Sequence, residues 1–472
     1  GLGEQRYVRS DGVSTHLQSV IPLCDLVVGT EEEIHIAGGS PDTLAALGRL
    51  RELTTGTLVV KRGPMGCVVF AGAIPDDIEQ GLKGPGFPVD VFNILGAGDA
   101  FMAGFLRGWV RDEPLERCCA YANACGALVV SRHGCAPAMP SWLELQDFLQ
   151  RGSKTRRLRE DVRLERLHRH TTRTRRWGDL TVLAFDHRAQ FVDMAAPHGA
   201  GADRIAACKR LIAEGARRGA KGARQDPAST APGTPDAGVI LDGRYGEAIF
   251  PEVTGCGLWV ARPVELPGSR PLAFEAGASL ALELRTWPGE HVAKCLVHYH
   301  PDDPPELRRQ QLERLAELQD ACVATHHEFL IEVIPPPGMP ADATTVARAL
   351  EQIFAADIVP DWWKLPPDPA PAAWEAITGM ILRFDPHCRG VLLLGLEASE
   401  EDLFRGFQVA ARFPMVKGFA VGRSIFADPA SAWFAGRATD ADVVTAVAER
   451  YARLIALWRE ARAEVTATAE TA

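Results

Sequence analysis

Short apolar segments alternate with amphipathic stretches along the first 150 residues. Three of these segments, 25–29, 57–63 and 66–70, are of strand length and rich in β-branched residues. Stretches in which apolar residues recur with helical spacing accompany them, at 42–53, 99–111 and 114–131. This alternation of strands and helices is typical of an α/β domain.

A second series of apolar segments begins near residue 179. Eight segments of strand length follow one another, most with a helical stretch behind them, and they fit a (β/α)8 barrel of about 280 residues in both number and length. The predicted strands are 180–185, 238–242, 257–261, 292–300, 329–334, 361–365, 391–395 and 416–422. The helical stretches are 203–218, 304–324, 342–355, 399–412 and 439–461.

A basic segment separates the two series. Residues 151–177 hold eleven Lys or Arg against three Asp or Glu, although the net charge of the whole chain is −10. No aromatic residues are interleaved with these charges, and the acidic remainder of the chain would repel a polyanion, so we expect no nucleic-acid partner. We predict a solvated, partly helical connector over 151–177, between domains at 1–150 and 178–465.

The composition sets further limits. The chain of 472 residues is 46% hydrophobic and 24% charged, as in a globular enzyme of two or more domains. No apolar run approaches the roughly 18–20 residues that span a bilayer, so we expect no membrane partner. The eleven cysteines lack metal-type spacing and indicate a reducing compartment, the cytoplasm. The chain starts at Gly1 within what reads as a folded unit, and we expect that start to be truncated.

The most specific motif of the first half is Gly-Ala-Gly-Asp at 96–99, directly before a predicted helix. Its glycines leave the backbone bare, and the first N–H groups of the helix can bind a phosphate that is being transferred. The aspartate can accept the proton of an attacking hydroxyl. Alone, the motif could equally be a glycine turn.

The motif stands in order with 29–33, 61–66 and 122–130, and together these segments resemble the C-terminal half of the ribokinase-like (PfkB) carbohydrate kinases. The resemblance implies a partial ribokinase-like α/β domain that uses ATP and Mg²⁺. The implied roles are the catalytic base for Asp99, the anion hole for Gly96, Ala97 and Gly98, the flanks of the nucleotide for Gly63 and Gly66, a place near the adenine for Asn123, and water-mediated Mg²⁺ binding for Glu33.

Two positions depart from that family, whose members usually carry Asp where Asn93 stands and Asn where Thr30 stands. The family also needs an N-terminal half that holds the sugar site, which the sequence before 96–99 does not supply. We therefore expect the kinase activity to depend on residues outside this sequence.

The predicted barrel strands end in a consistent set of charged residues. Barrel enzymes place their chemistry at the C-terminal ends of the strands. Asp186 follows the first strand, Lys294 lies on the fourth, Glu332 on the fifth and Lys364 on the sixth. A lysine in an apolar strand is costly to keep charged, and a neutral lysine can condense with a ketone to a Schiff base. Glu332 could then move protons, while Lys294 holds substrate oxygens.

Other interpretations of these residues stay open. Lys364 could pair with Asp361 or Asp368, or extend its amine to solvent. The histidines could instead bind zinc, as in metal-dependent aldolases, but the lysine pair would then lack a purpose, so we expect no metal in the barrel. These histidines are His298, His300, His326 and His327.

The loops after the seventh and eighth strands predict a phosphate site. Such loops bind phosphate through backbone N–H groups in many barrels. Gly395 and Gly422 would allow close approach of the ligand, and Arg423 would add a charged fork of donors. The alternative is a turn with a surface arginine.

The barrel segments 183–188, 293–303, 329–334, 361–365 and 418–426 resemble the class I, Schiff-base tagatose-bisphosphate aldolases. By that resemblance Lys364 is the Schiff-base lysine, Glu332 the proton shuttle, and Asp186 and Lys294 groups that bind or assist the substrate. His187 stands where glutamine is more usual, so the resemblance does not give its role.

The order of the two halves resembles bacterial fusion proteins of myo-inositol catabolism, which join a 5-dehydro-2-deoxygluconokinase to a 5-dehydro-2-deoxyphosphogluconate aldolase. The segments 28–33, 130–140 and 262–272 carry this resemblance. It implies a phosphorylated keto-sugar acid as the small-molecule substrate, cleaved to dihydroxyacetone phosphate and malonate semialdehyde. A kinase with a non-catalytic barrel, a phosphometabolite-binding protein without activity, and a homo-oligomer stay open.

Overall fold

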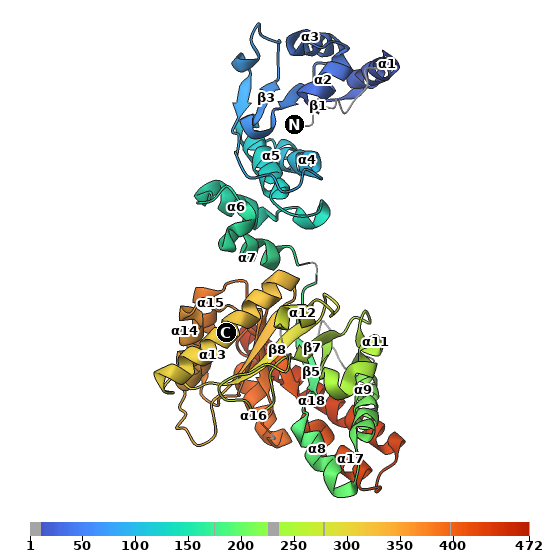
Figure 1. Cartoon of the computed structure of the whole chain (residues 1–472), viewed down its shortest axis with the longest axis vertical. Coiled ribbons are helices and arrows are strands. Elements are labelled where there is room, and N and C mark those ends of the chain that lie inside the picture. The colour runs from blue at the N-terminus through green and yellow to red at the C-terminus, as the bar shows by residue number, and fades with distance from the viewer. Residues whose placement is uncertain (1–10, 174, 225–235, 277–278, 397, 472) are drawn as a thin grey trace. The chain divides into compact units, whose positions relative to one another are not determined.

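A computed structural model describes residues 11–173, 175–224, 236–276, 279–396 and 398–471 of the chain. Contacts within the chain divide it into two compact units, Gly1–Thr174 (unit 1) and Arg175–Ala472 (unit 2). Each unit combines strands with helices (Figure 1).

Unit 1 contains a four-stranded sheet in the order β1-β2-β3-β4. The first two strands are parallel, whereas β3 is antiparallel to both of its neighbours. The strands are β1 (Leu26–Thr30), β2 (Thr57–Lys61), β3 (Cys67–Phe70) and β4 (Leu82–Gly84). The helices are α1 (Asp11–Val20), α2 (Glu31–Gly38), α3 (Thr43–Leu53), α4 (Ala97–Trp109), α5 (Leu115–Val130), α6 (Trp142–Arg151) and α7 (Val162–Thr171).

The sheet of unit 1 is covered on both faces because successive strand residues point to opposite sides. Val60 belongs to a buried cluster with Leu47 of α3. Its neighbour Val59 belongs to another, with Phe101 of α4. The helix layers on the two sides make unit 1 an α/β domain, as the apolar pattern predicts.

Most of the basic segment belongs to unit 1 instead of forming a separate connector, although it is partly helical and its side chains are mostly exposed or half-buried. The predicted boundary at residue 150 falls inside α6, and residues 151–173 belong to unit 1. Acidic side chains of the same unit neutralise several of its arginines: Arg163 pairs with Asp147, and Arg157 and Arg159 both pair with Asp90. The charge pattern alone did not reveal these pairs, because the acidic partners lie up to about 70 residues earlier in the sequence.

The eight strands of unit 2 close into a parallel barrel in the order β10-β11-β12-β5-β6-β7-β8-β9, which confirms the predicted (β/α)8 fold (Figure 1). The strands are β5 (Leu180–Ala184), β6 (Asp236–Ile240), β7 (Trp259–Pro263), β8 (Val292–His298), β9 (Phe329–Ile334), β10 (Trp362–Leu365), β11 (Gly390–Leu394) and β12 (Val416–Val421). The helices are α8 (Ala189–Ala195), α9 (Ala202–Arg224), α10 (Gly243–Gly246), α11 (Phe250–Val253), α12 (Leu280–Leu284), α13 (Pro305–Thr325), α14 (Thr345–Ala355), α15 (Pro371–Phe384), α16 (Glu400–Ala410), α17 (Arg423–Phe434) and α18 (Asp440–Thr471).

Alternate strand residues fill the inside of the barrel and the layer between strands and helices. The inner cluster includes Trp259 and Trp362, whose rings meet edge to face 5.6 Å apart. Trp363, the next residue, packs in the outer cluster against Phe354 of α14. Lys364 must therefore point inward again.

None of the helices in the described ranges is both long and apolar enough to span a lipid bilayer. All eleven cysteines are free thiols, and most of them are buried.

Candidate functional site

Four charged side chains lie at one end of the barrel interior. Each charged residue comes two positions after an apolar residue of the inner cluster. Because side chains two positions apart on a strand point to the same side, all four charged side chains point into the barrel. They are Asp186 after β5, Lys294 on β8, Glu332 on β9 and Lys364 on β10. The inner apolar residues below them are Ala184, Val292, Leu330 and Trp362.

Glu332 lies between the two lysines. Its Oε1 is 2.9 Å from Nζ of Lys364, and its Oε2 is 2.9 Å from Nζ of Lys294. Lys364 and Glu332 are direct neighbours in the register of β10 and β9. The three residues are only 3–5% exposed. The structure therefore pairs Lys364 with Glu332, rather than with Asp361 or Asp368.

Lys294 is surrounded by carboxylates. Besides Glu332, it contacts Asp186 Oδ2 at 3.0 Å and Glu265 Oε1 at 3.1 Å. Burial alone would lower the pKa of Lys294, but the three carboxylates raise it well above its ordinary value. Burial raises the pKa of Asp186 and of Glu332, yet Lys294 together with other positive groups, Lys364 among them, outweighs it, and both pKa values end below normal. Lys294 is therefore a fixed ammonium group and Asp186 a fixed carboxylate.

Glu265 is a member of this charged cluster that the sequence pattern did not single out. It follows β7, and its Oε1 also accepts a hydrogen bond from Arg188 Nη2 at 2.9 Å, while its Oε2 accepts one from the Leu296 N–H at 3.2 Å. Arg188 also binds Glu275, at 2.6 Å. The sequence did contain a signal for Glu265, because a carboxylate follows the third apolar strand, within the segment 262–272.

His187 is a neutral side chain beside this cluster. Its ring lies edge to face with Phe426, and its Nδ1 is 3.9 Å from Asp186 Oδ1. Burial lowers the pKa of His187 to about 4, with help from the charges of Lys364 and Arg423 and against the effect of Asp186. The ring is therefore an uncharged wall of the site at neutral pH.

The other histidines do not converge on a common point. The His300 ring contacts the Pro340 carbonyl and the Asp302 N–H, and the His327 ring contacts Thr325 and the Pro288 carbonyl. His298 is half-buried, and burial lowers its pKa. Across the residues that the structure describes, no three His, Cys, Asp or Glu side chains are grouped so that they could hold a metal ion.

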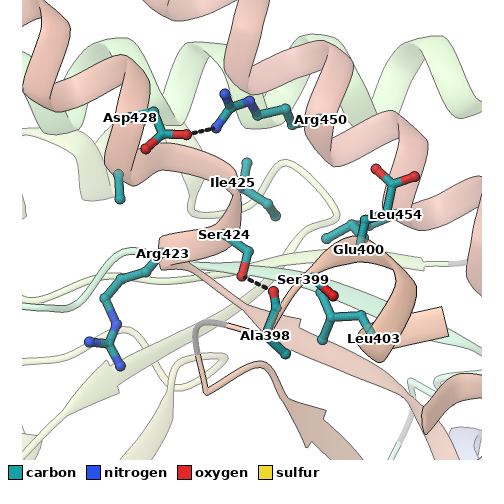
Figure 2. A pocket seen from close by; sticks show the side chains of 11 residues that line it. Ala398, Ser399, Glu400, Leu403, Arg423, Ser424, Ile425, Asp428, Arg450 and Leu454 are labelled. Carbon is teal, nitrogen blue, oxygen red and sulfur yellow. Dashed lines mark hydrogen bonds and ion pairs between the residues drawn. The ribbon is translucent and has the colours of Figure 1, made fainter. Parts of the chain in front are cut away.

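The predicted phosphate loops border a cavity of about 440 Å³, which Figure 2 shows. Arg423 and Ser424, from the first turn of α17, line it, and Ser424 Oγ donates a hydrogen bond to the Ala398 carbonyl at 3.0 Å. An ion pair between Asp428 and Arg450 closes another side, and Arg423 extends away from it. The loop backbone at Ala398 and the start of α17 are thus brought together.

Gly395 and Gly422 do not line this cavity. A Cβ at Gly422 would lie 2.1 Å from the Ala184 carbonyl oxygen and 2.8 Å from His187 Cε1. A Cβ at Gly395 would lie 3.0 Å from a methyl group of Val421. Close packing of β12 against the end of β5 accounts for Gly422, a reason that the sequence pattern did not reveal.

In unit 1, a second cavity, of about 310 Å³, gathers residues that the sequence analysis assigned to the nucleotide site. These residues come from three segments of the chain, and Lys61, Phe87 and Val130 line other parts of the cavity. The predicted residues among the lining are Gly63, Gly66, Ala97, Gly98 and Asn123.

Glycine is required at two turns around this cavity. Gly66 has φ +88°, and a Cβ there would lie 2.2 Å from the Gly84 carbonyl oxygen. Gly96 has φ +85° and precedes α4, and a Cβ there would meet Cys135 Sγ at 2.5 Å. Gly96 shapes the turn without lining the cavity, whereas Asp99, in the first turn of α4, is exposed.

Asn123 and Glu33 make contacts within the protein. The Asn123 amide donates to the Cys119 carbonyl at 2.9 Å and to Cys67 Sγ at 3.2 Å. Glu33 accepts from the Thr30 N–H in a capping box at the start of α2 and lies 3.3 Å from Lys61 Nζ. Burial raises the pKa of Glu33, but Thr30 and Lys61 lower it below normal, so one ionised carboxylate stands beside the cavity.

The two positions that depart from the kinase pattern have local roles. Thr30 caps α2 by accepting from the Glu33 N–H. Asn93 Oδ1 accepts from the Leu95 N–H, and its amide donates to the Gly134 carbonyl, both at 3.2 Å. Both side chains thus shape the loops at the ends of β1 and before α4.

Two family models match the chain. The model described as an uncharacterized protein conserved in bacteria (DUF2090) matches residues 144–462. The model of the pfkB family carbohydrate kinases matches residues 5–142.

Curated relatives align with the kinase-like part. A 5-dehydro-2-deoxygluconokinase of Geobacillus kaustophilus is 27% identical over 131 residues, which cover 27% of this chain and 38% of that protein. The probable fructokinase-7 of Arabidopsis thaliana is 33% identical over 145 residues, 28% of this chain and 40% of that protein. The chain thus spans about two fifths of the length of these relatives.

Among solved structures, the fructose-bisphosphate aldolase of Plasmodium falciparum aligns with 59% of this chain and 90% of its own, at 13% identity and a TM-score of 0.44.

Proposed function

The chain belongs to the DUF2090 family, uncharacterized proteins conserved in bacteria, and from that premise we propose that its barrel is an aldehyde-lyase that cleaves a phosphorylated keto acid through a Schiff base on Lys364. The match covers more than half of the chain but names no activity. The proposal therefore depends on the chemistry of the charged cluster in the barrel.

The observation that carries it is the shared carboxylate of Glu332. Of the two amines beside it, Lys294 contacts three carboxylates and stays an ammonium, whereas Lys364 forms its ion pair with Glu332. Transfer of one proton over the 2.9 Å from Lys364 to Glu332 gives a neutral amine and a carboxylic acid side by side. That is the pair which attacks a ketone and protonates its oxygen.

The reaction then balances with the groups present. The Lys364 amine adds to the ketone carbon, and Glu332 returns its proton as water leaves, which gives the iminium. The hydroxyl on the carbon β to the iminium loses its proton to a carboxylate, for which Asp186 is our candidate. The electrons of the hydroxyl O–H bond then form the C=O bond of the aldehyde. The electrons of the broken C–C bond form the C=C bond of an enamine. A proton on the enamine carbon and one water then release the ketone product.

We assign 5-dehydro-2-deoxygluconate 6-phosphate as the substrate. It has a ketone at C5 and a hydroxyl at C3, so cleavage between C3 and C4 gives dihydroxyacetone phosphate and malonate semialdehyde. Arg423, at the start of α17, is our candidate for the phosphate charge, with backbone N–H groups of the loops that follow β11 and β12. The named kinase relatives of unit 1 support this choice of substrate.

For unit 1, we propose phosphorylation of 5-dehydro-2-deoxygluconate. The cavity fits a nucleotide because its glycines leave backbone uncovered, and a Cβ at Gly98 would project to 3.6 Å from Lys61 Nζ. Its apolar wall suits an adenine ring, and Glu33 could hold the waters of Mg²⁺. When bound, ATP would supply the phosphoryl group and Mg²⁺ would neutralise the charge of its phosphates, while Asp99 would accept the proton of the sugar hydroxyl. We place both reactions in the cytoplasm, which the free thiols support.

The test is a cleavage assay of the whole chain with 5-dehydro-2-deoxygluconate 6-phosphate, which detects dihydroxyacetone phosphate with a coupled dehydrogenase. We expect turnover by the wild type and a fall of roughly 10⁴-fold or more in Lys364→Met. Turnover that survives this substitution refutes the Schiff base, and no turnover by the wild type refutes the substrate.

A further inference from the structure

A lysine that the mechanism does not use is completely buried on α9. Lys209 is 0% exposed and lies on the apolar face of its helix, between Ile205 and Ile212. A lysine is almost never fully buried unless it is paired, because removing its charge from water is costly. Its contacts therefore identify what it does.

The ammonium group of Lys209 binds the end of β5. It donates to the Phe185 carbonyl at 2.8 Å and to the His187 carbonyl at 3.1 Å, and it forms an ion pair with Asp242. These three partners use the three donors of a lysine. The two carbonyls belong to the residues immediately before and after Asp186.

This contact occurs where the strand ladder stops. The last residue pair of β5 and β6 is Ala184 with Ile240, and the Phe185 N–H still donates to the Ile240 carbonyl at 2.8 Å. Beyond that point the backbone around Asp186 turns toward α8. Lys209 supplies, from outside the barrel, hydrogen bonds for the carbonyls on either side of the turn.

Asp242 is itself fixed. Its Oδ1 accepts from the Tyr245 N–H at 2.9 Å and so caps α10. The lysine head group also lies 4.6 Å from the centre of the Phe191 ring, which stacks on Phe426. The Lys209 ammonium group and the Asp242 carboxylate thus connect the end of β6 to the end of β5.

We infer that Lys209 is a positioning residue for Asp186: by holding the carbonyls of Phe185 and His187, it keeps the Asp186 carboxylate pointed into the barrel, 3.0 Å from Lys294. The inference rests on the proposed lyase function. Because the Phe185 carbonyl before Asp186 and the His187 carbonyl after it are bound to one nitrogen, a backbone rotation at Asp186 that withdraws the carboxylate must break at least one of these bonds. Displacements of about 1 Å at a catalytic group can cost about 10²-fold in rate.

The test uses the full chain with Lys209→Met and Asp242→Asn combined. No buried charge is then left unpaired, and the amide oxygen introduced at position 242 can still accept from the Tyr245 N–H. We expect kcat for cleavage to fall about 10²-fold while KM stays within about threefold. Borohydride trapping of dihydroxyacetone phosphate at Lys364 should stay near the wild-type level. The acid limb of the kcat profile should move to higher pH, because Asp186 loses contact with Lys294.

The matched control is Arg389→Met with Glu328→Gln, which removes an ion pair before β11 and β9, at the opposite end of the barrel. It should lower the unfolding temperature but leave kcat and the acid limb unchanged. In an Asp186→Asn background, the Lys209 and Asp242 substitutions should cause no further loss of kcat.

The inference is overturned if the Lys209 and Asp242 variant behaves like the control, or if its losses add fully to those of Asp186→Asn. In both cases trapping at Lys364 leaves the proposed function intact. No trapping in the wild type instead removes the proposed function, and the inference with it. Should the double variant not fold, Lys209→Arg, which keeps the charge but not the single nitrogen between the carbonyls, provides the same readouts.

Discussion

The amine of Lys364 lies 2.9 Å from the carboxylate of Glu332, its neighbour in register on the adjacent barrel strand. A parallel pair of strands fixes this distance through the backbone, so it does not depend on a mobile loop. The second oxygen of the same carboxylate is held by Lys294. Glu332 is thereby oriented toward the Lys364 amine, which the proposed mechanism uses as the nucleophile.

The cluster should make the stability of the barrel depend on pH at both extremes. The pKa values of Asp186 and Glu332 are lowered in the folded state, so the stability they contribute is present above their unfolded values, about 4, and is lost as pH falls further. The pKa of Lys294 is raised, so its contribution is complete below its unfolded value, about 10.4, and is lost as pH rises through the higher folded value.

Urea unfolding followed by tryptophan fluorescence measures this dependence, since most of the ten tryptophans belong to unit 2. The free energy of unfolding should be nearly constant between pH 6 and pH 9 as far as these three groups are concerned, and Asp186→Asn should weaken the loss at acid pH. If that variant loses as much free energy of unfolding at acid pH as the wild type does, Asp186 is not the source of the loss.

His187 should not titrate in the working range. Its pKa of about 4 keeps the ring neutral at pH 6–8, so substitution by glutamine removes no charge there. We expect His187→Gln to keep kcat within roughly tenfold and to show the same profile between pH 6 and pH 8. A wild-type limb near pH 6.5 that disappears in this variant would instead make His187 an acid or base.

Gly422 should be the more sensitive of the two glycines in the predicted phosphate loops. In Gly422→Ala the new methyl group meets the backbone oxygen of Ala184, which cannot move aside without distorting β5. We expect a loss of about 1–3 kcal/mol in the free energy of unfolding. Gly395→Ala, which meets only a methyl group of Val421, is the control, and it should cost less than about 1 kcal/mol. Equal losses would contradict the packing account.

The two proposed activities should separate by mutation. Asp99 is exposed and is absent from the lining of the unit 1 cavity, so Asp99→Asn should leave ATP affinity within about threefold. In a protein that also carries the sugar-binding half of the kinase, phosphorylation of 5-dehydro-2-deoxygluconate should fall by about 10³-fold or more, on the order of general-base losses. Lyase activity should not change in this variant. Calorimetry measures ATP binding, and the phosphorylation and cleavage assays measure the two activities. Weakened ATP binding in the variant would indicate that Asp99 binds the nucleotide instead of acting as the base.

The sequence predicted the barrel and its four inward charges because period-two alternation fixes which strand residues face inside. Lys294, Glu332 and Lys364 lie on the strands themselves, and Asp186 lies only two residues beyond β5, where the alternation still continues. Glu265 and Lys209 were missed for a different reason. Glu265 lies beyond the end of β7, and Lys209 occupies an apolar position of a helix, so only their three-dimensional partners reveal their importance.

The basic segment shows the same limit. The sequence showed its positive charge, but the acidic side chains that pair with it, such as Asp90 and Asp147, meet the arginines only in the folded structure. Likewise, the pattern of glycines near residues 395 and 422 indicated a ligand, whereas the structure gives Gly422 a packing reason. Local composition does not distinguish these causes, because each depends on contacts between distant parts of the chain.

The most direct test of the central claim is to trap the intermediate and locate it. The whole chain is incubated with dihydroxyacetone phosphate and borohydride, digested, and mapped by mass spectrometry. We predict a reduced triose-phosphate adduct on Lys364 that is absent in Lys364→Met. An adduct on Lys294 instead, or no adduct in the wild type, would contradict the account.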